Sequence, residues 1–173
     1  MIKFVTLMLL PIFGFSQIRL DQKISILDQK VELLIPKELI KMTEDMWKIK
    51  YRNLKQPVLA LSDKDVEVNL IGQLTNQNWD EKNLDEYKNF RIDNLKKTRT
   101  DIQILETGIK DVYGKKMGFF KFMSQAVDAK IFNYYFFTIL DGKILIFTFN
   151  CTEKLRGSWE KIADEIVASV KIK

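Results

Sequence analysis

The chemistry open to this chain is limited first by what the sequence lacks. It contains no histidine and one cysteine, Cys151. Ser-His-Asp and Cys-His nucleophiles are therefore excluded, and so is a zinc site built on histidine. No histidine can activate Cys151 and no second cysteine can pair with it, so we expect a small buried thiol. Catalysis by an Asp/Glu pair or a lysine stays open as the less favoured alternative. We expect a protein that is not an enzyme and that needs no metal or cofactor.

Arg91 is the most unusual charged residue, because it falls inside an apolar stripe. The helix predicted over residues 84–98 carries that stripe on Leu84, Tyr87, Phe90 and Leu95. Arg91 lies near the middle of it, with Asn94 beside it. One interpretation is a guanidinium that binds the carboxylate or phosphate of an acidic ligand. The other, which is more common, is a side chain whose stem packs while its head reaches solvent or a core acid. Arg91 and Asn94 are thus candidate binding residues.

Trp47 and Tyr51 form a second candidate. Thr43 and the two acids after it predict the start of a short helix, and Met42, Met46 and Ile49 are expected on its apolar face. Trp47 and Tyr51 lie off that face, among the cations Lys48, Lys50, Arg52 and Lys55. Aromatic side chains between cations suit a sugar, a nucleotide or an acidic protein surface. A second buried face with ordinary surface lysines is the alternative.

Two further charge clusters need no ligand to explain them. The basic run at residues 96–99 ends the predicted helix, where cations are favoured by the helix dipole. Asp80, Glu81, Asp85 and Glu86 surround the start of the same helix, where acids are favoured for the same reason. Their spacing does not match a calcium-binding EF-hand loop. We therefore predict no metal site.

The sequence as a whole predicts a β-rich domain with three helices. Alternation and turn residues predict strands at 24–27, 31–35, 58–61, 66–71, 101–112, 117–127, 130–140 and 143–150. Asp141-Gly142 is the best hairpin signal, and a last helix is expected over residues 158–169. The strands on either side of that turn are apolar on both faces, so helices should cover both faces of the sheet. The predicted class is α+β, a twisted antiparallel sheet with helices on both faces.

The first sixteen residues predict export. Lys3 precedes an apolar stretch from Phe4 to Phe15, and Gly14 and Ser16 suit a signal peptidase that cuts before Gln17. The stretch is too short for a membrane span. Residues 1–16 are thus expected to be a signal peptide, and residues 17–173 a single domain that is periplasmic or secreted and soluble after cleavage. The charges of both signs alternate, which is typical of a solvated surface and not of a nucleic-acid partner.

Element order and spacing resemble the PsbP-like fold over roughly residues 24–172. The matching features are the early hairpin ending at Pro36, the mid-chain helix, the run of long strands, and Asn150-Cys151 followed by the helix from Trp159. This fold is named for an extrinsic subunit of photosystem II and is shared with a Ran-binding import protein and many bacterial envelope proteins. The resemblance implies an adaptor or assembly protein. Our leading hypothesis is a non-enzymatic binding module of the bacterial cell envelope. The alternatives are a carrier of a small acidic or lipidic ligand, or a histidine-independent hydrolase that uses Asp, Glu or Lys.

Overall fold

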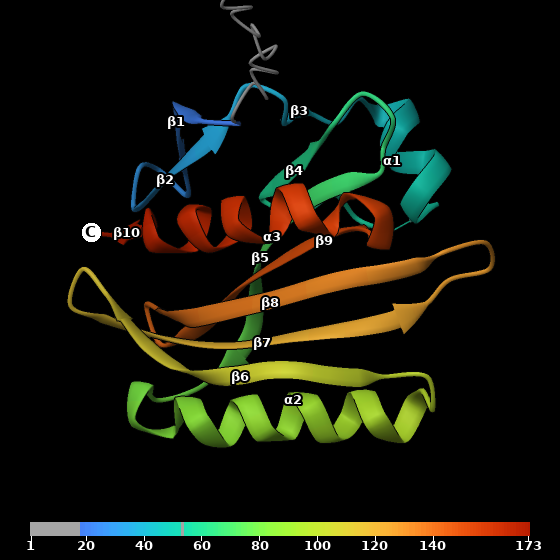
Figure 1. The fold of residues 1–173 in the computed structure, drawn as a ribbon. Helices are drawn as coiled ribbons and strands as arrows, with labels where there is room; N and C mark the ends of the chain where they lie inside the picture. The colour runs from blue at the N-terminus through green and yellow to red at the C-terminus, as the bar shows by residue number, and fades with distance from the viewer. Residues whose placement is uncertain (1–17, 53) are drawn as a thin grey trace, which may run out of the picture.

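The centre of the molecule is a seven-stranded antiparallel sheet with the strand order β3-β4-β5-β9-β8-β7-β6 (Figure 1). The computed structural model describes residues 18–52 and 54–173. The predicted signal peptide, residues 1–16, and the cleavage position before Gln17 lie outside these residues. The strands of the sheet are β3 (Ile40–Lys41), β4 (Leu59–Ser62), β5 (Val68–Asn78), β6 (Gln103–Val112), β7 (Lys115–Gln125), β8 (Lys130–Leu140) and β9 (Lys143–Thr152).

Consecutive hairpins connect the four strands from β6 to β9. Asp141 and Gly142 turn β8 into β9 with φ angles of 51° and 73°, which is the backbone that an Asp-Gly hairpin turn requires. Tyr113 and Gly114 turn β6 into β7 in the same way, with φ angles of 51° and 77°. The sequence signal for this part of the sheet is confirmed.

A second, three-stranded sheet brings the two ends of the described chain together. Its order is β1 (Leu20–Ile26), β2 (Val31–Pro36), β10 (Lys171–Ile172). The helix α3 (Glu153–Ala168) lies between this small sheet and the main one (Figure 1). Five side chains form its buried stripe: Trp159, Ile162, Ala163, Ile166 and Val167. They belong to the larger core, together with β2 and the inner faces of β8 and β9.

The helix α2 (Leu84–Thr98), preceded by the short 3-10 turn η1 (Glu81–Asn83), packs on the opposite face of the main sheet, against β7 and β6. Its core contains Leu84, Tyr87, Ile92, Phe120 and Phe137. The third helix, α1 (Glu44–Tyr51), precedes β4 and is capped by the Thr43 hydroxyl, which accepts a hydrogen bond from the Met46 amide at 3.2 Å. The α+β prediction, an antiparallel sheet covered by helices on both faces, is confirmed.

Two predicted helix faces are wrong in detail. Ile49 is 82% exposed and Phe90 is 46% exposed, whereas Trp47 and Ile92 are buried. In α1 the large indole takes the buried position, because its ring buries more apolar surface than Ile49 does. In α2 the buried side is rotated toward Ile92, so Phe90 lies at its margin.

Two element boundaries also differ from the prediction. Val66 lies in a turn with φ 58°, not in a strand. The Asp63 carboxylate holds that turn by accepting the amides of Glu67 and Val68 at 2.8 and 2.9 Å. The last helix begins at Glu153 instead of residue 158, because β9 leads directly into it and Gly157 does not interrupt it. None of the helices described here has the length and apolar character to cross a membrane.

Candidate functional site

The sheet face that carries α2 is covered on one side only. Residues directly opposite one another in neighbouring strands share a face, and one such row runs Thr107, Phe120, Tyr135, Thr148, Ile71. Phe120 is buried beneath α2, but the residues further along the row are only half-buried. Five half-buried or exposed residues of β5, β8 and β9 make up what we call the open strip: Ile71, Gln73, Tyr135, Thr148 and Asn150.

Arg91 and Asn94 lie on the side of α2 that faces the open strip. Tyr87 marks this side, because its ring contacts Phe137 of β8 at a centroid distance of 4.9 Å. Arg91 follows Tyr87 by four residues and therefore lies on the same face of the helix. Arg91 is half-buried and Asn94 is exposed. Burial raises the pKa of Tyr135, and the nearby Arg91 and Arg99 partly offset that rise.

Tyr51 approaches the same strip from α1. Burial raises the pKa of its phenol to about 12, and the nearby Asn150 side chain partly offsets the rise. Tyr51 also lines an open hollow together with Lys50, Arg52 and Leu54. The residues predicted on two separate helices thus border one sheet face from two sides.

Trp47 supports Tyr51 from behind. Its side chain is buried, and its ring stacks on that of Tyr51 with a centroid distance of 4.3 Å. The indole N–H donates to the Leu54 carbonyl at 2.7 Å. Trp47 therefore fixes the position of Tyr51 and the turn after α1, while Tyr51 is the member of the pair that reaches the surface.

A ladder of polar side chains, which sequence reasoning missed, orients Asn150. Asn69 is fully buried, and its Nδ2 donates to Asn150 Oδ1 at 3.0 Å. Asn69 Oδ1 accepts from the Ser62 hydroxyl at 3.1 Å. The bond from Asn69 fixes which end of the Asn150 amide is the oxygen, so its Nδ2, with two N–H donors, is turned toward Tyr51 or a ligand. The available signal was asparagine on β5, β8 and β9, at Asn69, Asn133 and Asn150.

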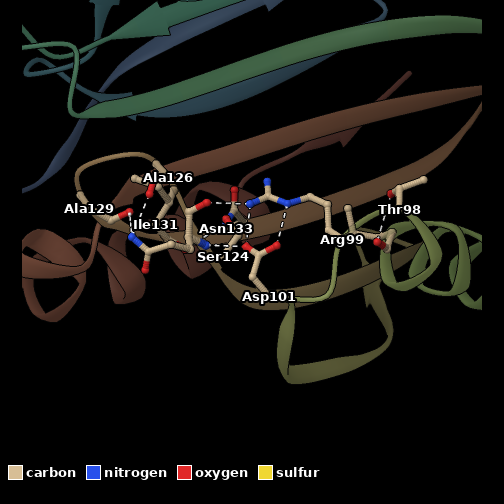
Figure 2. A network of polar contacts seen from close by, with 10 residues as sticks. Thr98, Arg99, Asp101, Ser124, Ala126, Ala129, Ile131 and Asn133 are labelled. Atoms are coloured by element: carbon tan, nitrogen blue, oxygen red, sulfur yellow. Dashed lines mark hydrogen bonds and ion pairs between the residues drawn. The ribbon is translucent and has the colours of Figure 1, made fainter.

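The end of α2 is fixed beside the strip by a second network (Figure 2). The Arg99 guanidinium binds the two Asp101 carboxylate oxygens at 3.1 and 2.6 Å and donates to the Gln125 carbonyl at 2.7 Å. These contacts and the Gln125 amide hold the pKa of Asp101 at about 2. Nearby, Asn133 donates to the Ser124 hydroxyl at 3.0 Å. The helix dipole explains a cation at the position of Arg99, but the ion pair of Arg99 with Asp101 is a contact that the sequence does not predict.

The opposite sheet face holds a lysine–carboxylate cluster, which sequence reasoning also missed. Lys121 of β7 is 4% exposed, and its ammonium lies 2.9 Å from both Glu106 and Asp164 and 3.5 Å from Glu160. Burial alone would lower the pKa of Lys121, but its hydrogen bonds to Asp164 and Glu106 raise it above the ordinary value. The ammonium therefore stays charged, which makes it an ion-pair partner and a poor base or nucleophile.

The remaining predicted groups have structural roles. Cys151 is fully buried, and burial raises the pKa of its thiol to about 12, as expected for an inert thiol. The Asp80 side chain caps η1 by accepting the Lys82 amide at 3.0 Å, and Asp85 pairs with Lys88. Within residues 18–52 and 54–173, no group of His, Cys, Asp and Glu side chains is arranged to hold a metal ion.

Comparison with known proteins supports the fold. No protein-family model matches the sequence, and no curated protein matches it either. Among solved structures, the cyanobacterial PsbP (CyanoP) of Synechocystis sp. is similar with a TM-score of 0.62 and 13% identity, over 96% of this chain and 99% of that one. LpqN of Mycobacterium tuberculosis, involved in cell envelope biogenesis, gives a TM-score of 0.58 at 10% identity over 83% of each chain. A protein of Bacteroides thetaiotaomicron gives 0.61 at 11% identity over 90% of this chain and 49% of that one.

Proposed function

We propose that this chain, which has the PsbP-like fold, is an exported, non-enzymatic binding module of the bacterial cell envelope. Its binding surface is the open strip between α2 and α1. Arg91, Asn94 and Tyr51 contact the partner, and Trp47 holds Tyr51 in place. The observation that carries the proposal is the row Phe120, Tyr135, Thr148, Ile71, in which only Phe120 is buried beneath a helix.

Three further observations support a binding role. The structural neighbours include a protein of cell envelope biogenesis, at a TM-score that shows a shared fold. The lysine–carboxylate cluster around Lys121 is paired, with the pKa of Lys121 raised, which argues against a lysine-dependent hydrolase. The strip residues are half-buried or exposed, which suits contact with a partner's surface better than enclosure of a small ligand.

The test is capture of partners from envelope extract by two matched variants. Thr148→Glu places a longer, charged side chain in the open strip, where it should block docking and abolish capture. Thr107→Glu makes the same substitution in the same row of the sheet, at the exposed edge strand β6, and should leave capture intact. Thermal melting of both variants checks that the fold is retained. Equal capture by the two variants would refute the strip as the binding surface.

Export is part of the proposal and has its own test. We propose that residues 1–16 are removed, because a cation followed by an apolar stretch and small residues is typical of a signal peptide. N-terminal sequencing of the protein recovered outside the cytoplasm should then begin at Gln17. Recovery of membrane-bound protein that retains Met1 would contradict it.

A further inference from the structure

Arg91 forms no ion pair with an acidic side chain of the described residues. Every Asp and Glu of the chain lies among the described residues, and none of them forms an ion pair with Arg91. Two other cations of the same region are paired, Lys88 with Asp85 and Arg99 with Asp101 at 2.6 Å. Lys96 and Lys97 of α2 have no ion pair within the described residues either, but both are exposed, whereas Arg91 is half-buried. A half-buried guanidinium that lacks a partner retains five N–H donors for an external acceptor.

One phenol near this guanidinium offers a further donor. Tyr135 is half-buried at the margin of α2, where its ring packs against that of Phe120 at a centroid distance of 5.2 Å. Tyr87, one turn before Arg91 on α2, is 1% exposed and belongs to the core. Burial raises the pKa of both tyrosines and Arg91 opposes the rise, so both phenols stay protonated at neutral pH. Within the described residues, neither hydroxyl is hydrogen-bonded to another part of the protein. The group that such donors select is an oxyanion.

The far end of the open strip also carries cations, at Lys48, Lys50, Arg52 and Lys55. Lys48 lies 3.5 Å from Glu44, and Lys50 donates to the Val66 carbonyl at 3.0 Å with Asp63 nearby, which leaves Arg52 and Lys55 for an external acid. Lys50 and Arg52 line the hollow beside Tyr51, and Arg52 and Lys55 are exposed. The Asn150 amide, oriented by Asn69, adds a donor between this end and Tyr135.

The width of the strip, measured from β8 to β5, sets the smallest ligand that can reach both of its ends. Adjacent strands lie about 4.8 Å apart, so β8, which carries Tyr135, and β5, which carries Ile71, are separated by roughly 10 Å. A free phosphate or a single carboxylic acid reaches one end only. An extended peptide advances about 3.3 Å per residue, so three to four residues span the strip.

From these observations we infer that the open strip binds an extended acidic peptide segment of the partner protein, with one carboxylate on Arg91 and Tyr135 and a second beside Arg52. The inference rests on the proposed binding function and adds the chemistry of the partner. Half-buried Ile71 and Thr148 form the floor between the two charged contacts. Alternating acidic and apolar side chains in the partner would match this pattern.

The experiment measures binding of two synthetic hexapeptides to the protein purified after export. One alternates glutamate and leucine, and the other alternates glutamine and leucine and so has the same shape without charge. We expect the acidic peptide to bind and the neutral one to bind at least about tenfold more weakly, since one charge-assisted contact is worth at least that factor. Binding of the acidic peptide should weaken as salt is raised.

Matched variants locate the contact. Arg91→Gln should weaken the acidic peptide by about tenfold or more, and Tyr135→Phe by a few-fold. Lys97→Gln removes one charge from an exposed position of the same helix and should change binding less than twofold. Equal effects of Arg91→Gln and Lys97→Gln, or equal binding of the two peptides, would overturn the inference.

Two further arms separate the alternatives. Full competition by inorganic phosphate or free glutarate, at concentrations comparable to the peptide, would show a small-anion site and overturn the peptide assignment. If the acidic peptide fails while Thr148→Glu still abolishes capture of the envelope partner and Thr107→Glu does not, the proposed function stands and only the acidic chemistry is wrong. If both assays fail, the proposed function fails as well.

Discussion

At the scale of single residues, Gly118 shows how closely the strands of the main sheet pack against side chains. It lies in β7 directly opposite Phe137 of β8. A Cβ added to Gly118 would overlap the Phe137 ring, which is completely buried and so has little room to move. Gly157 in α3 is the opposite case, since an added Cβ meets nothing within 4 Å.

We therefore expect Gly118→Ala to lower the free energy of unfolding by about 1–3 kcal/mol, the usual cost of overpacking a core. Gly157→Ala should raise it by about 0.5–1 kcal/mol, because alanine is the better residue inside a helix. Urea unfolding of the two variants beside the unchanged protein measures both effects. A Gly118→Ala protein as stable as the Gly157→Ala protein would contradict the packing described for Phe137.

Some residues of the candidate site could be predicted from the sequence and others could not. Arg91 and Tyr51 were predicted from aromatic and charged types at helical spacing, and the structure places both beside one sheet face. Whether they bind a partner stays a prediction. The Asn69–Asn150 contact could not be foreseen, because it joins residues 81 positions apart, and their meeting depends on the pairing register of β5 with β9. That register is a property of the assembled sheet.

At the scale of elements, Lys121 joins α3 to the edge of the main sheet. Its ammonium binds Asp164 of α3 and Glu106 of the edge strand β6, each at 2.9 Å. Lys110 of β6 adds a hydrogen bond to the Tyr134 hydroxyl at 2.7 Å and lies 3.8 Å from Asp164. Because the pKa of Lys121 is raised in the folded state, its ion pairs stabilise the fold at neutral pH and are lost only as pH rises through that raised pKa, above its ordinary value of 10.5.

Lys121→Met should cost about 2 kcal/mol of unfolding free energy at pH 7, since it removes hydrogen bonds to charged groups and leaves carboxylates facing one another. The cost should shrink above pH 10.5, where the Lys121 ammonium of the unchanged protein begins to lose its proton. Urea unfolding at the two pH values measures the difference. Lys97→Met serves as the control, because it replaces an exposed lysine and should be near neutral at both. A cost that does not depend on pH would indicate lost packing in place of lost charge.

Helix ends and turns could be predicted from the sequence because they depend on neighbouring residues, whereas the buried side of a helix depends on distant ones. Caps and turns are local, so the start of α1 at Thr43 and the Asp141-Gly142 hairpin were predicted correctly. The buried sides of α1 and α2 were not, because the choice of Trp47 over Ile49 and of Ile92 over Phe90 depends on what each helix packs against.

At the scale of the whole molecule, the α+β class and the helix-covered sheet were predictable because β8 and β9 are apolar on both faces. The three-stranded sheet was predictable only in its first hairpin. Its third strand, β10, is two residues long and comes from the other end of the chain. It is held by the Lys173 amide, which donates to the Lys30 carbonyl at 2.8 Å, and by the Lys173 ammonium on Glu32 at 2.6 Å.

Removal of residues 171–173 should lower the free energy of unfolding by about 2 kcal/mol, the sum of a few backbone hydrogen bonds. Amide hydrogen exchange should quicken in β2 and stay unchanged in β8, which lies in the other sheet. Lys173→Gln tests the contribution of the ion pair apart from that of the strand pairing. It removes only a surface ion pair and should cost no more than about 1 kcal/mol. Unaltered exchange in β2 after truncation would show that β10 does not hold the small sheet.

The pairing of β2 with β10 in one small sheet constrains the order in which the molecule can assemble. β2 pairs with β10, and both β1 and β2 pack on α3, so β1 and β2 complete their contacts only after residues 153–172 have been synthesised. Contacts between such distant segments make folding slow. For the export proposed above this delay is an advantage, because the chain is still open when it enters a translocation channel. Under that proposal the small sheet closes on the far side of the membrane, once β10 has crossed.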